Sequence, residues 1–283
     1  MKKKKYGKIF IIPTPIGNIY DITYRSIQVL KKIDYIAAEN YKKIKKILNK
    51  FNISKPIISF NQHNEFNKIQ KIFNKIEKKK NIALVSDAGT PTINDPGFCL
   101  IRECHQKKIK VIPLPGACSA ITALSASGIP SNKFCFEGFL PSKEIKRKKI
   151  LNLLKYEPRT IIFYETPHRI INSLQNIVEI LGKKRKITLA KELTKSWESI
   201  IFDTAENILY KYKNNKLICK GEIVLILSGY KNLEKKIISK KVKYILSILK
   251  KFLPKNKISV IISKMYNIKK QYIYKYLVNK TKK

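Results

Sequence analysis

The sequence has few residues of the kinds that build metal sites and disulfide scaffolds. Its five cysteines are scattered along 283 residues, and no two of them form a Cys-x-x-Cys pair. A zinc site needs cysteine or histidine ligands at close spacing, and a disulfide scaffold needs an even number of cysteines. We therefore expect no metal and no disulfide, and this use of cysteine predicts a reducing, cytoplasmic location.

Three common signatures of enzyme sites are also missing. The chain has no Walker A motif, no Gly-x-Gly-x-x-Gly motif and no His-Glu-x-x-His motif. These absences argue against a P-loop NTPase, a dinucleotide-binding dehydrogenase and a zincin protease. No Ser, His or Asp residue stands in a motif that indicates a nucleophilic catalytic site either.

No apolar run is long enough to cross a bilayer. The basic segment Lys2–Lys5 resembles the start of a signal peptide, but the apolar residues behind it, Ile9–Ile12, stop at Pro13. A transmembrane helix needs roughly 18 or more apolar residues. We therefore expect no membrane partner.

Acidic residues are scarce, because 19 Asp and Glu stand against 60 Lys and Arg, which gives a formal net charge of +41. Such a charge favours a polyanionic partner, since the positive groups otherwise repel one another. Only six of the basic residues are Arg, and Ile, Asn and Tyr are abundant. An A/T-rich coding sequence would produce the same profile, so we discount part of the charge.

The most informative stretch that is present is 82–97, where an apolar strand, Ile82–Ser86, runs into an elaborate loop. The eleven residues after the strand hold two Gly, two Pro and two Asp. The alternative interpretation is an ordinary connection from a strand to a helix, but such connections usually have only about 2–6 residues. In open α/β sheets, ligands bind beyond the carboxyl ends of strands, and Gly lets backbone N–H groups approach a ligand. The stretch therefore predicts a ligand site.

Two more Gly/Pro loops follow expected strands. Pro13–Asn18 comes after a strand over 8–12, and Pro115–Ala120 comes after a strand over 110–114. The second loop opens a helix of small residues, which either packs closely or leaves room for a flat ligand such as adenine. Apolar residues at helical spacing separate the strands. Asp21 and Thr23 are both good caps for the first helix. The alternation predicts a parallel sheet covered by helices on both faces.

Several of these segments resemble the bacterial 16S ribosomal RNA (cytidine-2'-O)-methyltransferases, a branch of the tetrapyrrole methylase superfamily. The resemblance extends from Lys8 to about Leu277. It is carried by Thr14–Asn18, Ser86–Pro91 with Asp95–Gly97, Phe134–Pro141, Glu192–Glu198 and Lys269–Leu277. The chain departs from the family at Asn40–Lys42, where the family has Asp-Thr-Arg, and at Ala117, where it usually has Pro. His63, in a segment similar to a family loop, reads as a hydrogen-bonded loop residue.

The resemblance implies an α/β fold with two α/β domains, a cleft for S-adenosylmethionine (SAM) between them, and a small C-terminal helical domain. We expect these domains to span 7–115, 116–230 and 231–283, the last of them basic, RNA-binding and preceded by a Lys-rich linker at Tyr230–Lys241. The positions that match cofactor-holding segments are Pro15, Gly17, Ser86, Asp87, Ala88, Gly89, Thr90, Asp95, Gly116 and Ala120.

Methyl transfer from a sulfonium mainly needs in-line positioning of the nucleophile. A ribose 2'-hydroxyl is a weak nucleophile, so a base that removes its proton would add roughly 10²–10⁴-fold. Four residues are candidates for this base and are left unranked: Asp87, Glu39, His168 and Glu192. Thr166-Pro167 predicts a helix start with His168 in the first turn, where a simple hydrogen bond at the start of the helix is the alternative role.

The expected partner is 16S ribosomal RNA in the small ribosomal subunit, with the enzyme as a homodimer. The basic segment Lys143–Lys149 begins a helix that Ile150, Leu153 and Leu154 are expected to bury. Such a run of charged residues usually forms a solvent-exposed helix face, and an RNA contact is the more specific hypothesis. The candidate RNA-binding residues are Arg25, Arg147, Lys148, Arg169, Lys195, Lys269 and Lys270.

Two other functions remain open on the sequence. A tetrapyrrole (corrinoid) C-methyltransferase would share the fold and the cofactor, but a macrocyclic substrate does not call for a basic helical tail. A non-catalytic RNA-binding protein would explain the charge, but it would not explain three Gly/Pro loops placed after strands.

Overall fold

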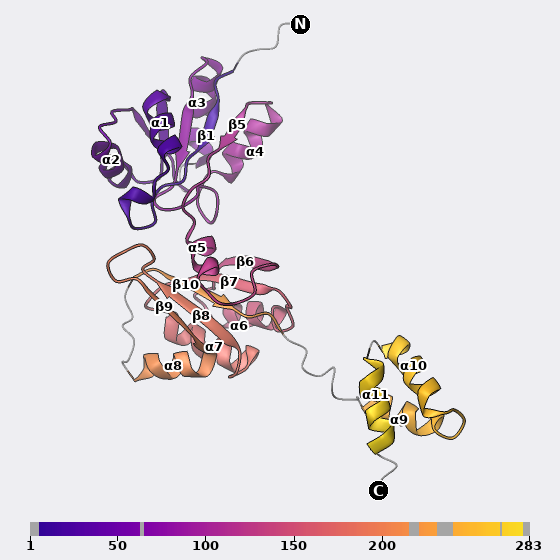
Figure 1. The fold of residues 1–283 in the computed structure, drawn as a ribbon. Coiled ribbons are helices and arrows are strands. Elements are labelled where there is room, and N and C mark those ends of the chain that lie inside the picture. The colour runs from indigo at the N-terminus through magenta and orange to yellow at the C-terminus, as the bar shows by residue number, and fades with distance from the viewer. Residues whose placement is uncertain (1–5, 63–64, 215–220, 231–239, 267, 280–283) are drawn as a thin grey trace, which may run out of the picture. The chain divides into compact units, whose positions relative to one another are not determined.

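The structure is a computed structural model of the chain, and it describes residues 6–62, 65–214, 221–230, 240–266 and 268–279. The chain divides into two compact units, Met1–Gly229 and Tyr230–Lys283. The first unit contains two five-stranded sheets (Figure 1). The division into three domains at 7–115, 116–230 and 231–283 stays a prediction, and most of the expected linker lies outside the described residues.

The first sheet is parallel throughout, with the strand order β3-β2-β4-β1-β5. Every residue of the central strand β4 is buried, as expected for a parallel strand that is covered on both faces. The parallel sheet predicted from the strand–helix alternation is confirmed. Its strands are β1 (Ile9–Ile11), β2 (Tyr35–Ala38), β3 (Ile57–Ser59), β4 (Ile82–Val85) and β5 (Val111–Pro113).

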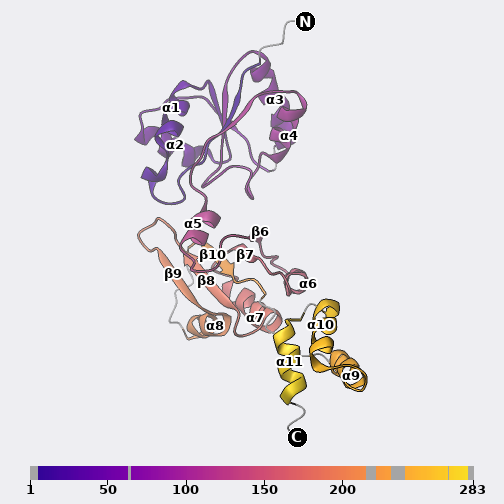
Figure 2. The same ribbon diagram turned by 45° about the vertical axis from the view of Figure 1, so that its right-hand side comes forward.

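Helices pack on both faces of this sheet (Figure 2). On one face lie α1 (Tyr24–Lys32) and α2 (Tyr41–Lys50), which share a buried apolar cluster with β2. On the other lie α3 (Glu65–Glu77) and α4 (Phe98–Gln106). Helix α1 begins after Thr23, whose hydroxyl accepts a hydrogen bond from the Ser26 N–H. Asp21 instead ends a short 3-10 helix, η1 (Ile19–Asp21).

The second sheet is mixed and has the order β6-β7-β10-β8-β9. Only β6 and β7 pair in parallel, and the other neighbours pair antiparallel. The central strand β10 is buried at every residue, which agrees with its continuous apolar sequence Ile-Val-Leu-Ile-Leu. The strands are β6 (Phe134–Phe139), β7 (Thr160–Glu165), β8 (Lys186–Lys191), β9 (Ser199–Thr204) and β10 (Ile223–Leu227).

Helices also cover both faces of the second sheet. Helices α6 (Glu144–Leu153), α7 (Ile170–Leu181) and α8 (Ala205–Lys213) share one buried cluster, and α5 (Ser119–Ser125) packs on the opposite face. The sequence pattern did not predict β9 and α8. Strand β9 is at the sheet edge and has no buried residue, so its apolar residues give no clear burial pattern.

Two expectations about the helices of the second sheet are wrong. Helix α7 begins at Ile170 instead of near Thr166, because 166–169 forms a turn that the Arg169 N–H closes onto the Thr166 carbonyl at 3.1 Å. The Thr166 hydroxyl accepts a hydrogen bond from the Arg169 guanidinium in this turn and does not cap a helix. In α6, Leu153 is 77% exposed, whereas Leu151 is the buried residue.

The second unit is a three-helix cluster. It consists of α9 (Lys240–Leu249), α10 (Lys255–Tyr266) and α11 (Lys270–Asn279), and α10 starts directly after Pro254. The C-terminal helical region expected from the sequence is confirmed. Its core consists of Val242, Leu246, Ile258, Ile262, Ile273 and Leu277. Among the helices of the described ranges, none is long and apolar enough to cross a membrane.

Candidate active site

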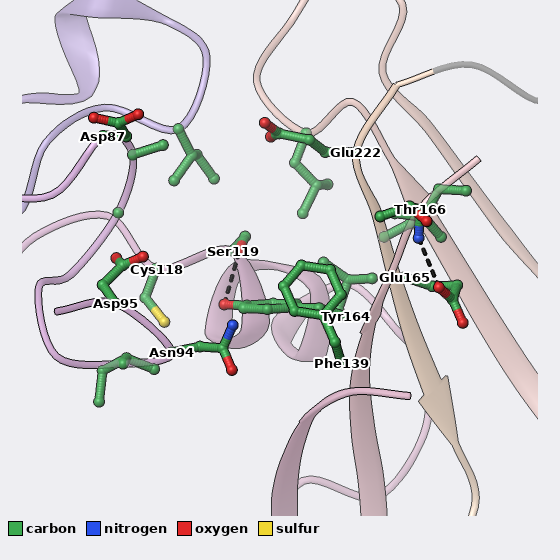
Figure 3. Close-up of a pocket in the computed structure, with 18 of the residues that line it drawn as sticks. Asp87, Asn94, Asp95, Cys118, Ser119, Phe139, Tyr164, Glu165, Thr166 and Glu222 are labelled. Atoms are coloured by element: carbon green, nitrogen blue, oxygen red, sulfur yellow. Dashed lines mark hydrogen bonds between the residues drawn. The ribbon is translucent and has the colours of Figure 1, made fainter. Parts of the chain in front are cut away.

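A cavity of about 300 Å³ lies inside the first unit, between loops of the first sheet and strands of the second. The first sheet contributes the loop after β4, at the carboxyl end of the strand. The second contributes the ends of β6 and β7 and the start of β10 (Figure 3). Ligands of open α/β sheets bind at such strand ends, and ligand cavities typically measure about 300–1,000 Å³. We call this cavity the pocket.

Half of the predicted cofactor-holding residues line the pocket. They come from the loop after β4 and are Asp87, Ala88, Gly89, Thr90 and Asp95. Gly89 has φ +82, a conformation that favours glycine. Its N–H and carbonyl both pair with Thr14, at 2.9 Å each. The Gly89 N–H is therefore already used inside the protein, and the role of Gly89 is to let the chain turn there.

The other half lie outside the lining and support it. A Cβ atom at Gly17 would meet Thr194 Oγ1 and Lys195 Cγ at 2.6 Å, and one at Gly116 would meet Pro13 Cβ at 2.6 Å. These two glycines therefore allow close packing of chain on chain. Ser86 is buried and donates to the Gly89 carbonyl at 3.0 Å. Pro15 does not line the pocket, and Ala120 lies in the core beneath it.

Two carboxylates that line the pocket, Asp87 and Asp95, and one that does not, Glu39, influence one another. Burial raises the pKa of Asp95 to about 6, and the negative charges of Glu39 and Asp87 add to this effect. Burial, followed by the charge of Asp87, also raises the pKa of Glu39. Asp87 itself forms an ion pair with Lys43, with 2.9 Å between Oδ2 and Nζ. The part of the chain that the structure describes contains no group of three His, Cys, Asp or Glu residues arranged to hold a metal.

The remaining two candidate bases, like Glu39, lie outside the pocket lining. His168 is exposed in the turn after β7, and its Nε2 lies 3.3 Å from Thr166 Oγ1. Glu192 Oε1 accepts hydrogen bonds from Lys195 Nζ at 2.9 Å and from the Glu222 N–H at 2.8 Å. Burial alone would raise the pKa of Glu192, but these hydrogen bonds, together with the positive charges of Lys195 and Lys191, lower it. His63 lies outside the described residues.

The pocket also has an aromatic wall that the sequence did not single out. The Tyr164 hydroxyl accepts a hydrogen bond from Ser119 Oγ at 2.9 Å, which joins β7 to the start of α5 (Figure 3). Phe136 and Phe139 contact the Tyr164 ring edge-on, with centroids 4.9 and 5.5 Å away. Burial is the main reason that the pKa of Tyr164 is raised. An aromatic residue at the end of a strand was the only available sequence signal.

Two candidate RNA-binding arginines have structural partners. Arg147 is buried, and its guanidinium donates to Asn176 Oδ1 at 2.8 Å and to the carbonyls of Pro141 and Ser142. The prediction that Arg147 contacts RNA is therefore corrected, because its donors are satisfied inside the protein. Arg169 forms an ion pair with the buried Glu165 at 3.0 Å.

The other RNA-binding candidates are at the surface. Lys148 pairs with Glu144 and Glu179, and Lys195 pairs with Glu192 and Glu222. Arg25 in α1 and Lys269 and Lys270 at the start of α11 are exposed.

The family model for Tetrapyrrole (Corrin/Porphyrin) Methylases matches residues 8–209. The chain is 51% identical to the ribosomal RNA small subunit methyltransferase I of Buchnera aphidicola subsp. Baizongia pistaciae, over 98% of this chain and 95% of that protein. It is 44% identical to the protein of the same name from Escherichia coli O157:H7, over 95% of this chain and 94% of that protein.

Solved structures share the fold at low sequence identity. A cobalt precorrin-4 methyltransferase of cobalamin biosynthesis matches with a TM-score of 0.58 at 14% identity, over 78% of this chain and 94% of that one. A uroporphyrin-III C-methyltransferase from Thermus thermophilus, complexed with S-adenyl homocysteine, matches with a TM-score of 0.55 at 11% identity, over 78% and 97% of the two chains. With the family match and the close relatives, these findings show that the chain belongs to the tetrapyrrole methylase family, in the branch of the ribosomal RNA small subunit methyltransferases I.

Proposed function

We propose that this chain transfers the methyl group of SAM to the 2'-hydroxyl of a cytidine in 16S ribosomal RNA, within the small ribosomal subunit. The pocket carries the proposal, because it lies at the carboxyl end of β4 and combines carboxylates with an aromatic wall. The names of relatives up to 51% identical support ribosomal RNA as the substrate. The cytidine and its 2'-hydroxyl come from the resemblance of the sequence motifs.

The pocket residues fit SAM. SAM supplies a methyl group that is already activated by the positive charge on its sulfur. Asp87 and Asp95 place negative charge along the wall formed by the loop after β4, which suits a sulfonium and an ammonium group. On the opposite side, Tyr164 and Phe139 offer apolar ring surface to a flat group. The described residues therefore supply charge for one end of the ligand and ring surface for the other.

Asp95 is the best candidate for the base that accepts the proton of the 2'-hydroxyl. It lines the pocket, whereas Glu39, His168 and Glu192 do not. Asp87 also lines it, but its carboxylate is paired with Lys43. A general base works best with a pKa close to the operating pH, and the pKa of Asp95 is raised to about 6. Asp95 was expected from the sequence to hold the cofactor, so the structure adds a fifth candidate to the four.

The C-terminal unit is proposed as an RNA-binding module. Its core uses one face of each helix, and the surface keeps lysines together with exposed rings, including Tyr244 at 68% and Phe252 at 75% exposure. Rings and lysines together suit single-stranded RNA. The homodimer and the cytoplasmic location stay predictions from the sequence.

One experiment tests the proposed reaction. The gene is deleted, ribose methylation is mapped across 16S RNA by mass spectrometry, and the protein is then restored. Loss and recovery of one 2'-O-methylcytidine is the expected result. An unchanged 16S map combined with altered corrinoid methylation would move the chain to the tetrapyrrole branch.

A further inference from the structure

Helix α2 carries a stripe of lysines with no acidic residue in the helix. Its ten residues include Lys43, Lys46 and Lys50, which are three and then four positions apart and therefore share one side of the helix. All three are exposed, while Ile44 and Leu48 face the core. At about 1.5 Å per residue, the stripe is about 10 Å long.

One end of the stripe lies at the pocket. Lys43 belongs to the pocket lining, and its ammonium group is 2.9 Å from the Asp87 carboxylate. The stripe therefore begins beside the carboxylates of the candidate active site. It leads away from the pocket along the surface of α2.

The other end lies beside an exposed aromatic ring, and a second exposed ring follows it in the chain. Lys50 Nζ is 5.2 Å from the centroid of the Tyr20 ring. Tyr20, in η1, is 67% exposed, and Tyr24, the first residue of α1, is 76% exposed. A lysine face that only keeps a helix soluble has no need for a tyrosine ring left in water beside it.

Lysines that follow a phosphate backbone, together with rings on which bases stack, are the features by which proteins hold single-stranded nucleic acid. We infer that Lys43, Lys46, Lys50, Tyr20 and Tyr24, together the α2 track, bind the unpaired nucleotides that flank the methylated ribose. This inference rests on the proposed function, because the flanking nucleotides are defined by the ribose in the pocket. The track is specific to one face of the first sheet, and the opposite face provides a control.

The rings are tested by matched substitutions that keep or remove the stacking surface. Tyr20→Leu/Tyr24→Leu removes both rings, and Tyr20→Phe/Tyr24→Phe keeps them. The assay follows tritium from labelled SAM into small subunits taken from a strain that lacks the gene. The Leu variant should raise KM for subunits at least about fivefold, with kcat and the Kd for SAM unchanged. The Phe variant should match the wild type. Equal KM values for the two variants would overturn the role of the rings.

The lysines are tested against lysines on the opposite face of the sheet. Lys46→Gln/Lys50→Gln should weaken binding of a labelled single-stranded RNA and reduce the salt slope of log Kd by about 1.4. Lys71→Gln/Lys78→Gln removes two exposed lysines at and just after α3 and should leave the slope unchanged. An equal loss for both pairs would mean that only total charge matters, which overturns the α2 track. Thermal unfolding of all variants checks that each is folded.

The outcomes separate this inference from the proposed function. If the wild type transfers no methyl group into subunits, the proposed function fails, and RNA binding by the same variants still tests the track. If the wild type is active and all variants behave alike, only the α2 track fails. A higher KM for subunits with unchanged affinity for free RNA would indicate a ribosomal protein as the partner and would overturn the RNA assignment.

Discussion

The loop after β4 and the turn after β7 both follow the carboxyl end of a buried strand, and both present an acid, but they use it differently. Glu165, in β7 at the turn, is 2% exposed and accepts hydrogen bonds from the Thr166 N–H, the Arg169 guanidinium and the Ser173 hydroxyl. Asp95, in the loop after β4, faces the pocket beside other negative charges. An acid surrounded by donors holds structure together, whereas an acid among like charges in a cavity is available for chemistry.

The backbone of the two segments differs in the same direction. The loop after β4 contains Thr92 and Asn94 with φ +72 and +65, a region that costs a β-branched residue such as threonine of order 1–3 kcal/mol. No residue of the turn 166–169, which the structure describes in full, has a positive φ. Strain of this kind collects at functional sites, where the rest of the fold holds it in place. The loop after β4 is therefore the more specialised segment.

The largest expected effect is on catalysis by Asp95→Asn. The substitution keeps the shape of the side chain but removes the base, so kcat should fall about 10²–10⁴-fold. Single-turnover transfer from tritiated SAM measures it. Asp87→Asn is the matched comparison at saturating SAM: because the Asp87 carboxylate is paired with Lys43 and is proposed to contact the cofactor, this variant should change the Kd for SAM more than kcat. A fall in kcat for Asp87→Asn alone would reverse the roles of the two aspartates.

The same Asp95→Asn substitution should raise stability at pH 7. The pKa of Asp95 is raised to about 6 from 3.8, so the folded state binds a proton more readily than the unfolded state between those values. The contribution of Asp95 to stability is therefore most favourable below about pH 4 and is lost as the pH rises through about 6. Asn carries no charge, so the melting temperature of the variant should exceed that of the wild type at pH 7 and approach it at pH 4.

Glu165→Gln should mainly lower the stability of the fold. Removing the charge of a buried carboxylate that pairs with Arg169 at 3.0 Å should cost about 2–3 kcal/mol of unfolding free energy. Thermal and urea unfolding give the measurement. Glu179→Gln is the control, because its pair with Lys148 is exposed and should contribute less than about 1 kcal/mol. Equal costs for the two would remove the distinction between the buried and the exposed acid.

The pH dependence of catalysis should be smaller but diagnostic. Since the base must be ionised, kcat should fall about tenfold for each pH unit below about 6, the value to which the pKa of Asp95 is raised. A pH–rate profile in constant ionic strength measures it. A profile that is flat between pH 5 and 7 would exclude Asp95 as the base.

Gly89→Ala is expected to have the smallest effect. A Cβ at Gly89 would meet Ile16 Cγ2 at 3.5 Å, an ordinary contact, but the φ of +82 strains any other residue. The cost should be about 1–2 kcal/mol of stability, with the Kd for SAM changed little, because the Gly89 N–H is paired with Thr14. Calorimetry and thermal unfolding separate the two quantities. A large loss of SAM affinity in a stable variant would show that Gly89 contacts the ligand directly.

The amino-acid pattern predicted much of the first sheet and the tail. The strands expected over 8–12, 82–86 and 110–114 correspond to β1, β4 and β5, and the expected C-terminal helical domain corresponds to α9, α10 and α11. The loop over 86–97 was recognised because Gly, Pro and Asp mark unusual backbone wherever they collect. Strand β9 was missed because its apolar residues, Ile200–Phe202, form a short run at the sheet edge that does not alternate with polar residues and is not buried.

The sequence by itself determined many of the local elements, the family, and which loop has the unusual backbone, because periodicity, motifs and turn residues report on neighbours along the chain. Only the tertiary structure decided which distant residues meet. Ser119 and Tyr164 are 45 positions apart and share a hydrogen bond. Arg147 is no longer a candidate RNA contact, because Asn176, 29 positions away in the sequence, accepts a hydrogen bond from its guanidinium in the protein interior. Burial, and with it the pKa of Asp95, depends on the packing of the whole unit, which no local pattern encodes.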